Sequence, residues 1–211
     1  MPVGIFKTRG PVVNLDRSRK ARMIEAFLAD GLGSDVSGKR ILDIGCGNGM
    51  ISTYFSQRNT VTGVDVEDLR RGDSHDFRFI QVDSAGLPLA DADFDIVLSH
   101  HVIEHIPAQV EHLQEMHRVL KPNGLAYLGT PNRSSPVMEG HVGNDMVLRY
   151  RDMAKLFREC GFESELLSLR LVADPSRYHG DVKFGRFFPD PIQRALIPIY
   201  PSHHFLLRKR Q

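Results

Sequence analysis

Ile41-Leu42-Asp43-Ile44-Gly45-Cys46-Gly47-Asn48-Gly49 is the stretch of this 211-residue chain that decides the fold. It reads as a buried strand that runs into a glycine-rich turn, and the turn opens a helix. Glycine adopts positive φ without strain and lets a ligand approach the backbone, while N–H groups at a helix start suit a negative or polar ligand group. Sixteen residues after Gly49, Asp65 ends the next β-rich run, where a carboxylate can accept both hydroxyls of a ribose. The stretch therefore predicts a site for a ribose-bearing ligand.

The spacing of the glycines separates two classes of cofactor that use this layout. The dinucleotide fingerprint G-x-G-x-x-G would place its third, close-packing glycine where this chain has Met50. The observed spacing is G-x-G-x-G, and Asp43 precedes it by two residues. A carboxylate at that point offers nothing to a pyrophosphate but suits a cationic ligand. A nicotinamide oxidoreductase is therefore disfavoured.

Strands and helices alternate outward from this stretch. Short β-rich or apolar runs predict strands at 40–44, 60–65, 77–82, 94–99, 124–130, 162–172 and 204–208. Apolar residues at helical spacing predict helices over 17–29, 49–57 and 150–160, and a longer helix that begins near Pro107 and is ended by Pro122-Asn123-Gly124. This alternation implies an α/β fold with a mainly parallel, doubly wound sheet covered on both faces.

Composition and charge exclude several classes of protein. The formal net charge is +1, and without a basic excess or a known binding module we expect no nucleic-acid partner. Cys46 and Cys160 form neither a disulfide scaffold nor a zinc site. The start lacks a signal-peptide pattern and no apolar run reaches about 18 residues, so we expect a cytoplasmic protein without a transmembrane segment. A peripheral membrane contact through the apolar run 192–200, flanked by basic residues, remains open, and so does the oligomeric state.

Further motifs follow the glycine turn in a fixed order. They are Gly63-Val64-Asp65, Asp83, Phe94–Ser99, Glu104-His105-Ile106, Val119–Gly124 and Thr130-Pro131-Asn132. Together with Leu42–Gly49, this set resembles the class I S-adenosylmethionine-dependent methyltransferases, in the type 11 branch with the ubiquinone-biosynthesis O-methyltransferases. The resemblance runs from about residue 39 to 162, with a weaker match at the last strand. It implies a seven-stranded Rossmann-like sheet, mainly parallel, with an antiparallel C-terminal strand.

We expect a single class I methyltransferase domain in four parts. Residues 1–38 would form an N-terminal helical cap, 39–173 the cofactor-binding core, 174–203 a substrate lid and 204–211 the final strand. For residues 174–203, which interleave aromatic and basic side chains, contact with lipid and plain packing of a long loop on the sheet are the alternatives.

The same resemblance implies which residues bind S-adenosylmethionine. The glycine turn would hold the methionine and ribose part, Asp65 with its neighbour Val66 the ribose hydroxyls, and Asp83 with Ser84 the adenine. Ser99 and His100 would line the site beside the sulfonium. The full expected set is Asp43, Gly45, Cys46, Gly47, Asn48, Gly49, Asp65, Val66, Asp83, Ser84, Ser99 and His100. A helix cap or a surface charge is the alternative for each aspartate.

The segment Ser99–His105 places three histidines at the same end of the sheet. A hydroxyl acceptor must lose a proton, and histidine is the usual general base near neutral pH. We expect His105 first and His101 second in that role; a structural hydrogen-bonding role is the alternative for His105. The pattern H-x-x-E-H over His101, Glu104 and His105 is also compatible with a divalent metal, but the sequence favours a site without metal.

The sequence thus predicts an enzyme that moves a methyl group from S-adenosylmethionine to a small-molecule acceptor. An oxygen atom of a quinone precursor, of a lipid-linked intermediate or of a sugar is the expected target. The alternative is a non-catalytic, S-adenosylmethionine-binding partner subunit, because the glycine turn and Asp65 predict binding in either case.

Overall fold

The computed structural model describes residues 17–70, 76–83, 86–133, 135, 146–168, 170, 177 and 202–210. The expected adenine contact Ser84 lies outside the described residues, and so do residues 1–16 of the expected cap and all of the expected lid except positions 177, 202 and 203. The division into four parts, lid included, stays a prediction. Among the helices of the described ranges, none is both long and apolar enough to cross a membrane.

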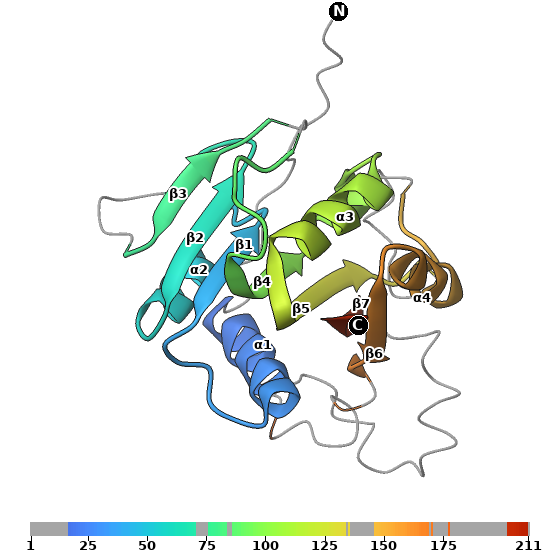
Figure 1. Ribbon diagram of the computed structural model, residues 1–211, viewed down its shortest axis with the longest axis horizontal. Coiled ribbons are helices and arrows are strands. Elements are labelled where there is room, and N and C mark those ends of the chain that lie inside the picture. The colour runs from blue at the N-terminus through green and yellow to red at the C-terminus, as the bar shows by residue number, and fades with distance from the viewer. Residues whose placement is uncertain are drawn as a thin grey trace, which may run out of the picture.

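A seven-stranded sheet with the order β3-β2-β1-β4-β5-β7-β6 forms the centre of the molecule (Figure 1). Its strands are β1 (Arg40–Ile44), β2 (Thr60–Asp65), β3 (Arg78–Gln81), β4 (Phe94–His100), β5 (Leu120–Pro131), β6 (Phe162–Leu166) and β7 (Ser202–Lys209). Strands β1 to β5 run parallel, and β7 pairs antiparallel with both β5 and β6. The predicted fold class is confirmed, including the antiparallel C-terminal strand.

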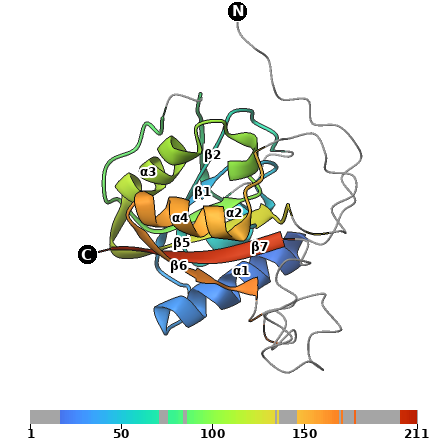
Figure 2. The same ribbon diagram turned by 90° about the vertical axis from the view of Figure 1, so that its right-hand side faces the viewer.

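Helices cover both faces of the sheet (Figure 2). They are α1 (Arg17–Leu32), α2 (Met50–Ser56), the 3-10 turn η1 (Ile103–His105), α3 (Gln109–Val119) and α4 (Tyr150–Glu159). Apolar residues of α1 and α2 share one core cluster with Ile41, Leu98 and Leu206 of the sheet, whereas those of α3 and α4 share another with Leu42 and Val97. Because alternate residues of a strand point to opposite faces, the neighbours Ile41 and Leu42 of β1, like Val97 and Leu98 of β4, belong to different clusters.

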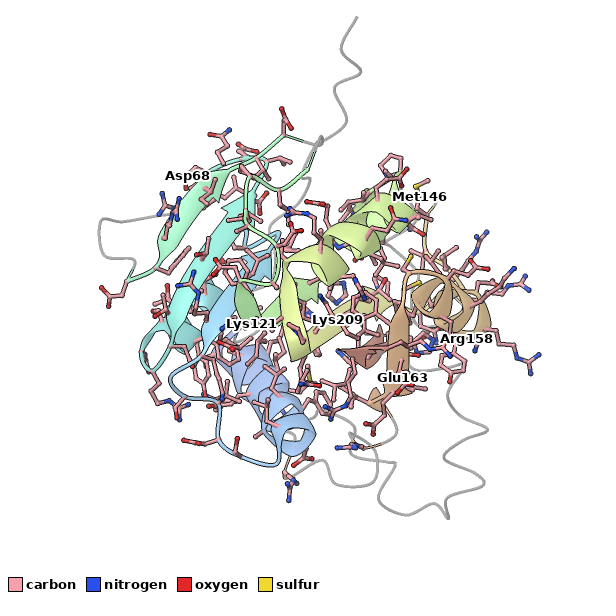
Figure 3. The ribbon with its side chains drawn as sticks, viewed as in Figure 1. Asp68, Lys121, Met146, Arg158, Glu163 and Lys209 are labelled. Atoms are coloured by element: carbon pink, nitrogen blue, oxygen red, sulfur yellow. The ribbon has the colours of Figure 1, made fainter. Side chains whose placement is uncertain are left out.

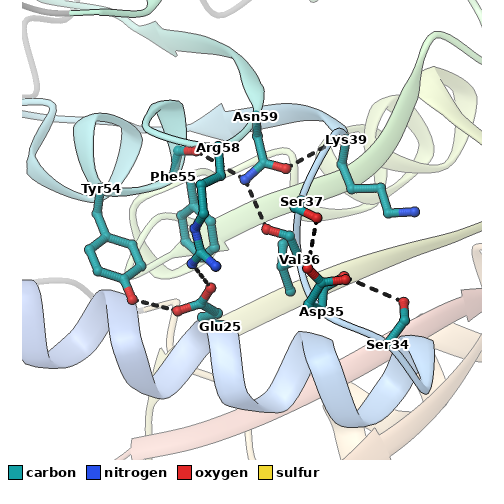
Figure 4. Close-up of polar contacts among 10 residues, drawn as sticks. All are labelled: Glu25, Ser34, Asp35, Val36, Ser37, Lys39, Tyr54, Phe55, Arg58 and Asn59. Carbon is teal, nitrogen blue, oxygen red and sulfur yellow. Dashed lines mark hydrogen bonds and ion pairs between the residues drawn. The ribbon is translucent and has the colours of Figure 1, made fainter.

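Polar contacts join α1 to α2 and to the loop before β1 (Figure 4). The Tyr54 hydroxyl donates to Glu25 of α1, and Arg58 forms an ion pair with the same carboxylate. The Asn59 amide donates to the carbonyls of Val36 and Phe55. These bonds tie the loop before β1 to the end of α2, opposite the edge where the glycine turn lies.

Two predicted element boundaries are wrong. The long helix ends at Val119, not at Pro122-Asn123-Gly124, because proline clashes with the carbonyl four residues earlier and disfavours helical backbone at the residue before it. Leu120 is already extended (φ −76°, ψ 132°) and pairs with Phe94, and the register then shifts so that Ile96 pairs with Leu125. The strand expected over 162–172 ends at Leu166, and residue 167 lies in a turn.

The site follows from this topology. The parallel strands β1, β2 and β4 end side by side, at Ile44, Asp65 and His100. In open α/β sheets, ligands bind outside the carboxyl ends of the strands, where the strand order reverses. Here β1 is flanked by β2 and β4, so the glycine turn that follows β1 lies at that reversal.

Candidate functional site

The glycine turn after β1 has a backbone that only glycine adopts readily. Gly45, Gly47 and Gly49 have φ of 69°, 55° and 78°. The N–H groups of Gly45 and Cys46 both donate to the Val64 carbonyl of β2, at 2.8 and 3.1 Å. The turn is therefore fixed to the neighbouring strand before α2 begins at Met50.

Asp65 connects the end of β2 to this turn. Its Oδ2 accepts the Gly47 N–H at 2.7 Å, and its Oδ1 accepts the Val66 N–H at 2.8 Å. A carboxylate oxygen has more than one acceptor position, so these bonds orient the group and leave it able to accept hydroxyl donors. The carboxylate thus lies at the turn, and its role in binding a ribose stays a prediction.

Asp43 lies beneath the turn rather than on its surface. Its side chain is 2% exposed, and the Ser52 hydroxyl of α2 donates to Oδ2 at 2.6 Å. Burial raises the pKa of Asp43 to about 7, the Ser52 hydrogen bond opposes this shift, and the charge of Asp65 adds to it. A cationic ligand above the turn would stabilise the ionised form of this carboxyl.

The segment after β4 lies against the glycine turn. A Cβ atom on Gly45 would come within 2.3 Å of the Val102 side chain, so the two backbones approach as closely as glycine permits. His101 adopts φ of 58°, and its N–H donates to the Gly129 carbonyl at 2.8 Å. Positive φ in a bulky residue is strained and tends to occur at functional sites. The histidine segment is thereby placed at the edge that carries the turn.

A buried carboxylate, Glu104, lies between two of the histidines. Its side chain is 3% exposed, and its Oε1 is 3.1 Å from Nδ1 of His101 and 4.0 Å from Nε2 of His105. Thr130 of β5 donates to Oε2 at 3.4 Å. His101 and His105 are themselves 33% and 41% exposed. A buried carboxylate that holds Nδ1 of a half-exposed histidine is an arrangement that orients a general base.

The remaining expected residues differ in their surroundings. Ser99 is fully buried and lies 3.1 Å from Nε2 of His112, whose pKa burial lowers to about 4, so its hydroxyl contacts α3. Asp83 is exposed just beyond β3, and Val66 is 40% exposed beside Asp65. Cys46 is buried, and burial raises the pKa of its thiol far above the usual range, which leaves it as a packing residue.

The structure brings most predicted residues to one edge and adds partners that the sequence analysis missed. The additional residues are Ser52, Val102, His112 and Thr130. Val102 and Thr130 lie in segments that the sequence analysis singled out without giving these residues a role, and Ser52 lies in the first turn of the helix that the glycine turn opens. His112 had no such signal. Among the described residues, no group of three or more histidine, cysteine or acidic side chains is arranged to hold a metal ion.

Comparisons with known proteins find similarity to methyltransferases. Residues 42–128 match the family model described as "Methyltransferase domain". The chain is 33% identical over 110 residues to a ubiquinone biosynthesis O-methyltransferase of Pseudomonas aeruginosa and 32% identical over 110 residues to the protein of that name from Dechloromonas aromatica. Each match covers 47% of this chain and 47% of the relative, so the chain spans about half the length of the curated relatives it matches.

Solved structures share the fold at lower identity. A Burkholderia thailandensis 1,6-didemethyltoxoflavin-N1-methyltransferase, solved with S-adenosylhomocysteine, is 20% identical with a TM-score of 0.61, covering 95% of this chain and 81% of that chain. The plantazolicin methyltransferase is 17% identical with a TM-score of 0.65, covering 92% and 84%. A [4+2]-cyclase is 20% identical with a TM-score of 0.60, covering 90% and 80%. These likenesses show the fold alone, which a cyclase shares with methyltransferases.

Proposed function

We propose that this chain transfers a methyl group from S-adenosylmethionine to an oxygen atom of a small acceptor, because residues 42–128 match the family model described as "Methyltransferase domain". The observation that carries the proposal is the pair of carboxylates, Asp43 and Asp65, on either side of a turn whose three glycines have positive φ. The two carboxylates and the glycine turn together suit a ligand that contains both a cationic centre and a ribose.

The cofactor is S-adenosylmethionine, which supplies an electrophilic methyl group when bound. We assign its contacts to Gly45–Gly49, Asp65 and Val66, with Asp83 and Ser84 toward the adenine and Ser99 and His100 toward the sulfonium. Asp65 would accept the ribose hydroxyls while its hydrogen bond to Gly47 keeps the carboxylate oriented. Asp43 would contribute negative charge from below the turn and hold α2 through Ser52.

The geometry favours His101 over His105 as the general base, the reverse of the order expected from the sequence. Nδ1 of His101 faces the buried Glu104 carboxylate, which leaves Nε2 to take the proton of an acceptor hydroxyl. The Glu104 charge then stabilises the imidazolium that forms. His105 is the more exposed histidine and lies at the edge of hydrogen-bond range from the same carboxylate.

The acceptor is proposed as a phenolic oxygen of a quinone precursor, with a lipid-linked intermediate and a sugar as the next candidates. Support comes from the name of the relatives, ubiquinone biosynthesis O-methyltransferase, and from a base placed to remove a hydroxyl proton. The same base would be superfluous for a neutral amine, which has its own lone pair. A non-catalytic cofactor-binding subunit is the second candidate, because the fold also occurs in a [4+2]-cyclase.

Cofactor binding is tested by isothermal titration of the full chain with S-adenosylmethionine, S-adenosylhomocysteine and NAD. We expect both sulfur compounds to bind, NAD not to bind, and Asp65→Ala to abolish binding. Asp35→Ala is the matched control, because Asp35 is an exposed carboxylate before β1, at the opposite edge of the sheet. Unchanged affinity in Asp65→Ala would contradict the site.

Catalysis is tested with methyl-labelled cofactor and a panel of catechol, sugar and amine acceptors. We expect transfer to a catechol oxygen, and a loss of about 10²–10⁴-fold in kcat for His101→Asn, with cofactor affinity retained. Asparagine is chosen because it tolerates the positive φ at this position. His105→Asn is the matched control and should keep most of the rate. Cofactor binding without transfer to any acceptor class would instead favour the non-catalytic subunit.

A further inference from the structure

Gln109, the first residue of α3, joins two segments of the chain through one side-chain amide. Its Nε2 donates to the Ile103 carbonyl at 3.0 Å and to the Met146 carbonyl at 2.8 Å. Ile103 begins the 3-10 turn η1, which also contains Glu104 and His105, whereas Met146 lies 37 residues along the chain from Gln109. Figure 3 shows Met146 near the start of α3. The amide therefore bridges the histidine segment and the chain that leads into α4.

The chemistry of the two partners fixes which way the Gln109 amide points. A carbonyl oxygen accepts hydrogen bonds, and a glutamine side chain carries two donor hydrogens on Nε2 beside an acceptor oxygen. Two carbonyls next to one amide can therefore be satisfied only by its nitrogen, and each takes one of the two hydrogens. Both distances lie within the usual range of N–H···O bonds. The bridge thus requires a side chain that offers two donors at this position.

Burial of Ile103 anchors η1 without orienting it. Ile103 is 1% exposed and lies in the core cluster that also contains Leu113 of α3 and Met153 of α4. Apolar burial has no preferred direction, whereas a hydrogen bond weakens steeply as its angle bends. The bond from Gln109 to the Ile103 carbonyl therefore supplies a direction that packing does not.

The orientation of η1 decides where the Glu104 carboxylate lies, because Glu104 follows Ile103 directly. Its Oε1 is 3.1 Å from Nδ1 of His101. The bond that Thr130 of β5 donates to its Oε2 is longer, at 3.4 Å, and restrains the carboxylate less. A rotation of η1 about Ile103 would carry the carboxylate away from His101. We propose that Gln109 is a positioning residue, which holds η1 between α3 and the chain before α4 so that Glu104 faces His101.

The effect on catalysis rests on the proposed function, whereas the position of the carboxylate does not. With His101 as the general base, a displaced Glu104 slows proton removal and leaves the glycine turn intact. A misplacement of about 1 Å costs up to about 10²-fold in rate. We therefore expect loss of the Gln109 donors to lower kcat by about 10–10²-fold and to leave the KM for S-adenosylmethionine near its wild-type value.

Gln109→Met is the variant that tests this role. Methionine is uncharged, similar in length and as good a helix former as glutamine, but it offers no donor. Gln114→Met makes the same change at an exposed position of the same helix and is the matched control. Any difference between the two variants therefore reports the bridge rather than the substitution.

The first readout is independent of methyl transfer. Ring resonances of His101 and His105 are recorded on the full chain without cofactor or acceptor and are assigned with His101→Asn and His105→Asn. We expect both sets to move in Gln109→Met and to stay in place in Gln114→Met. Unchanged histidine resonances in Gln109→Met would overturn the proposal.

The second readout is kinetic. A fall in kcat at unchanged KM for S-adenosylmethionine supports the positioning role, because a general loss of structure would weaken cofactor binding as well. A rise in that KM at unchanged kcat would contradict it. If the histidine resonances move while the wild type methylates no acceptor, the positioning role stands and the proposed function fails.

The wild type offers a measurement that needs no folded variant. Both side-chain amide hydrogens of Gln109 are held by carbonyls, so in ¹⁵N-glutamine-labelled protein we expect them to exchange with solvent more slowly than those of the exposed Gln114. Equal exchange at the two side chains would show that the bridge does not persist and would overturn the proposal.

Discussion

Ionisation of the buried Asp43 carboxyl lowers the stability of the folded protein. Its pKa is raised to about 7, mainly by burial, so the folded state holds a proton that the unfolded state releases near pH 4. The folded protein therefore loses stability as the pH rises from about 4 to 7, and the loss is complete above 7. Three pKa units at 1.36 kcal/mol each set the scale at about 4 kcal/mol.

Asp43→Asn should remove this dependence while keeping an oxygen for Ser52. We expect the variant to melt at a higher temperature than the wild type at pH 8 and the difference to shrink toward pH 4. Thermal unfolding of both proteins across this range measures it. A variant less stable than the wild type at pH 8 would show that the ionised carboxylate stabilises the fold.

The pKa shift of Asp95 is opposite in sign to that of Asp43, so its effect on stability has the opposite pH dependence. Although desolvation acts to raise its pKa, the Arg40 N–H and the Lys121 ammonium hold that pKa below its usual value. Its contribution is therefore present above pH 4 and is lost as the pH falls through the folded-state pKa. Asp95→Asn should lower the melting temperature at pH 7 and do so less at pH 3, and an equal effect at both values would contradict the assignment.

At the scale of elements, Gly45 lets the glycine turn lie close to the segment after β4. Gly45→Ala places a methyl group against Val102 and also requires positive φ in an L-residue. The backbone cost is about 1–2 kcal/mol, and overpacking adds about 1–3 kcal/mol. Denaturant unfolding should show the sum as a loss of about 2–5 kcal/mol.

Val102→Ala separates the two costs. In the double variant the clash is relieved and the backbone cost remains, so we expect Gly45→Ala to be less damaging in a Val102→Ala background than in the wild type. Equal damage in both backgrounds would mean that Val102 does not restrict the turn.

The elements themselves were largely predictable from periodicity and from glycine and proline positions. The strands before Gly45 and around Asp65, and the helix of residues 150–159, follow directly from local patterns. The failures have different causes. Leu120 leaves the helix to pair with Phe94, a partner that is not local in the sequence, whereas the strand from Phe162 gives way to a turn in which the Arg170 N–H donates to the Leu167 carbonyl.

In the site too, features built by neighbouring residues were predictable and contacts between distant residues were not. The glycine turn and Asp65 were predictable because the chain must itself build that turn within 25 residues. The contacts of Glu104 with Thr130 and of Ser99 with His112 were not, since side-chain pairing across elements leaves no spacing signal. The proposed order of His101 before His105 also rests on which ring faces the buried carboxylate, and this orientation leaves no signal in the sequence.

For the whole molecule, the last strand is part of the core rather than an appendage. Figure 2 shows β7 running along the sheet, and its partners are β5 and β6. Figure 3 shows Arg158 of α4 pointing outward from the molecule. It also shows Met146 near the start of α3, and the side-chain amide of Gln109 donates to the Met146 carbonyl there. Loss of β7 would separate β6 from the sheet and expose both core clusters, because Leu206 belongs to one and Phe205 and Leu207 to the other.

A chain cut before residue 202 should therefore fail to fold, although it keeps every residue assigned to the cofactor. Phe205, Leu206 and Leu207 are almost fully buried, and at about 1.5–3 kcal/mol each their removal costs about 5–9 kcal/mol. This loss is comparable with the whole stability of a domain, about 5–15 kcal/mol. Circular dichroism should show an unfolded chain without a cooperative melt, whereas a chain cut after Arg210 should melt like the full one. A folded, cofactor-binding fragment 1–201 would instead place the stability of the fold in the parallel strands alone.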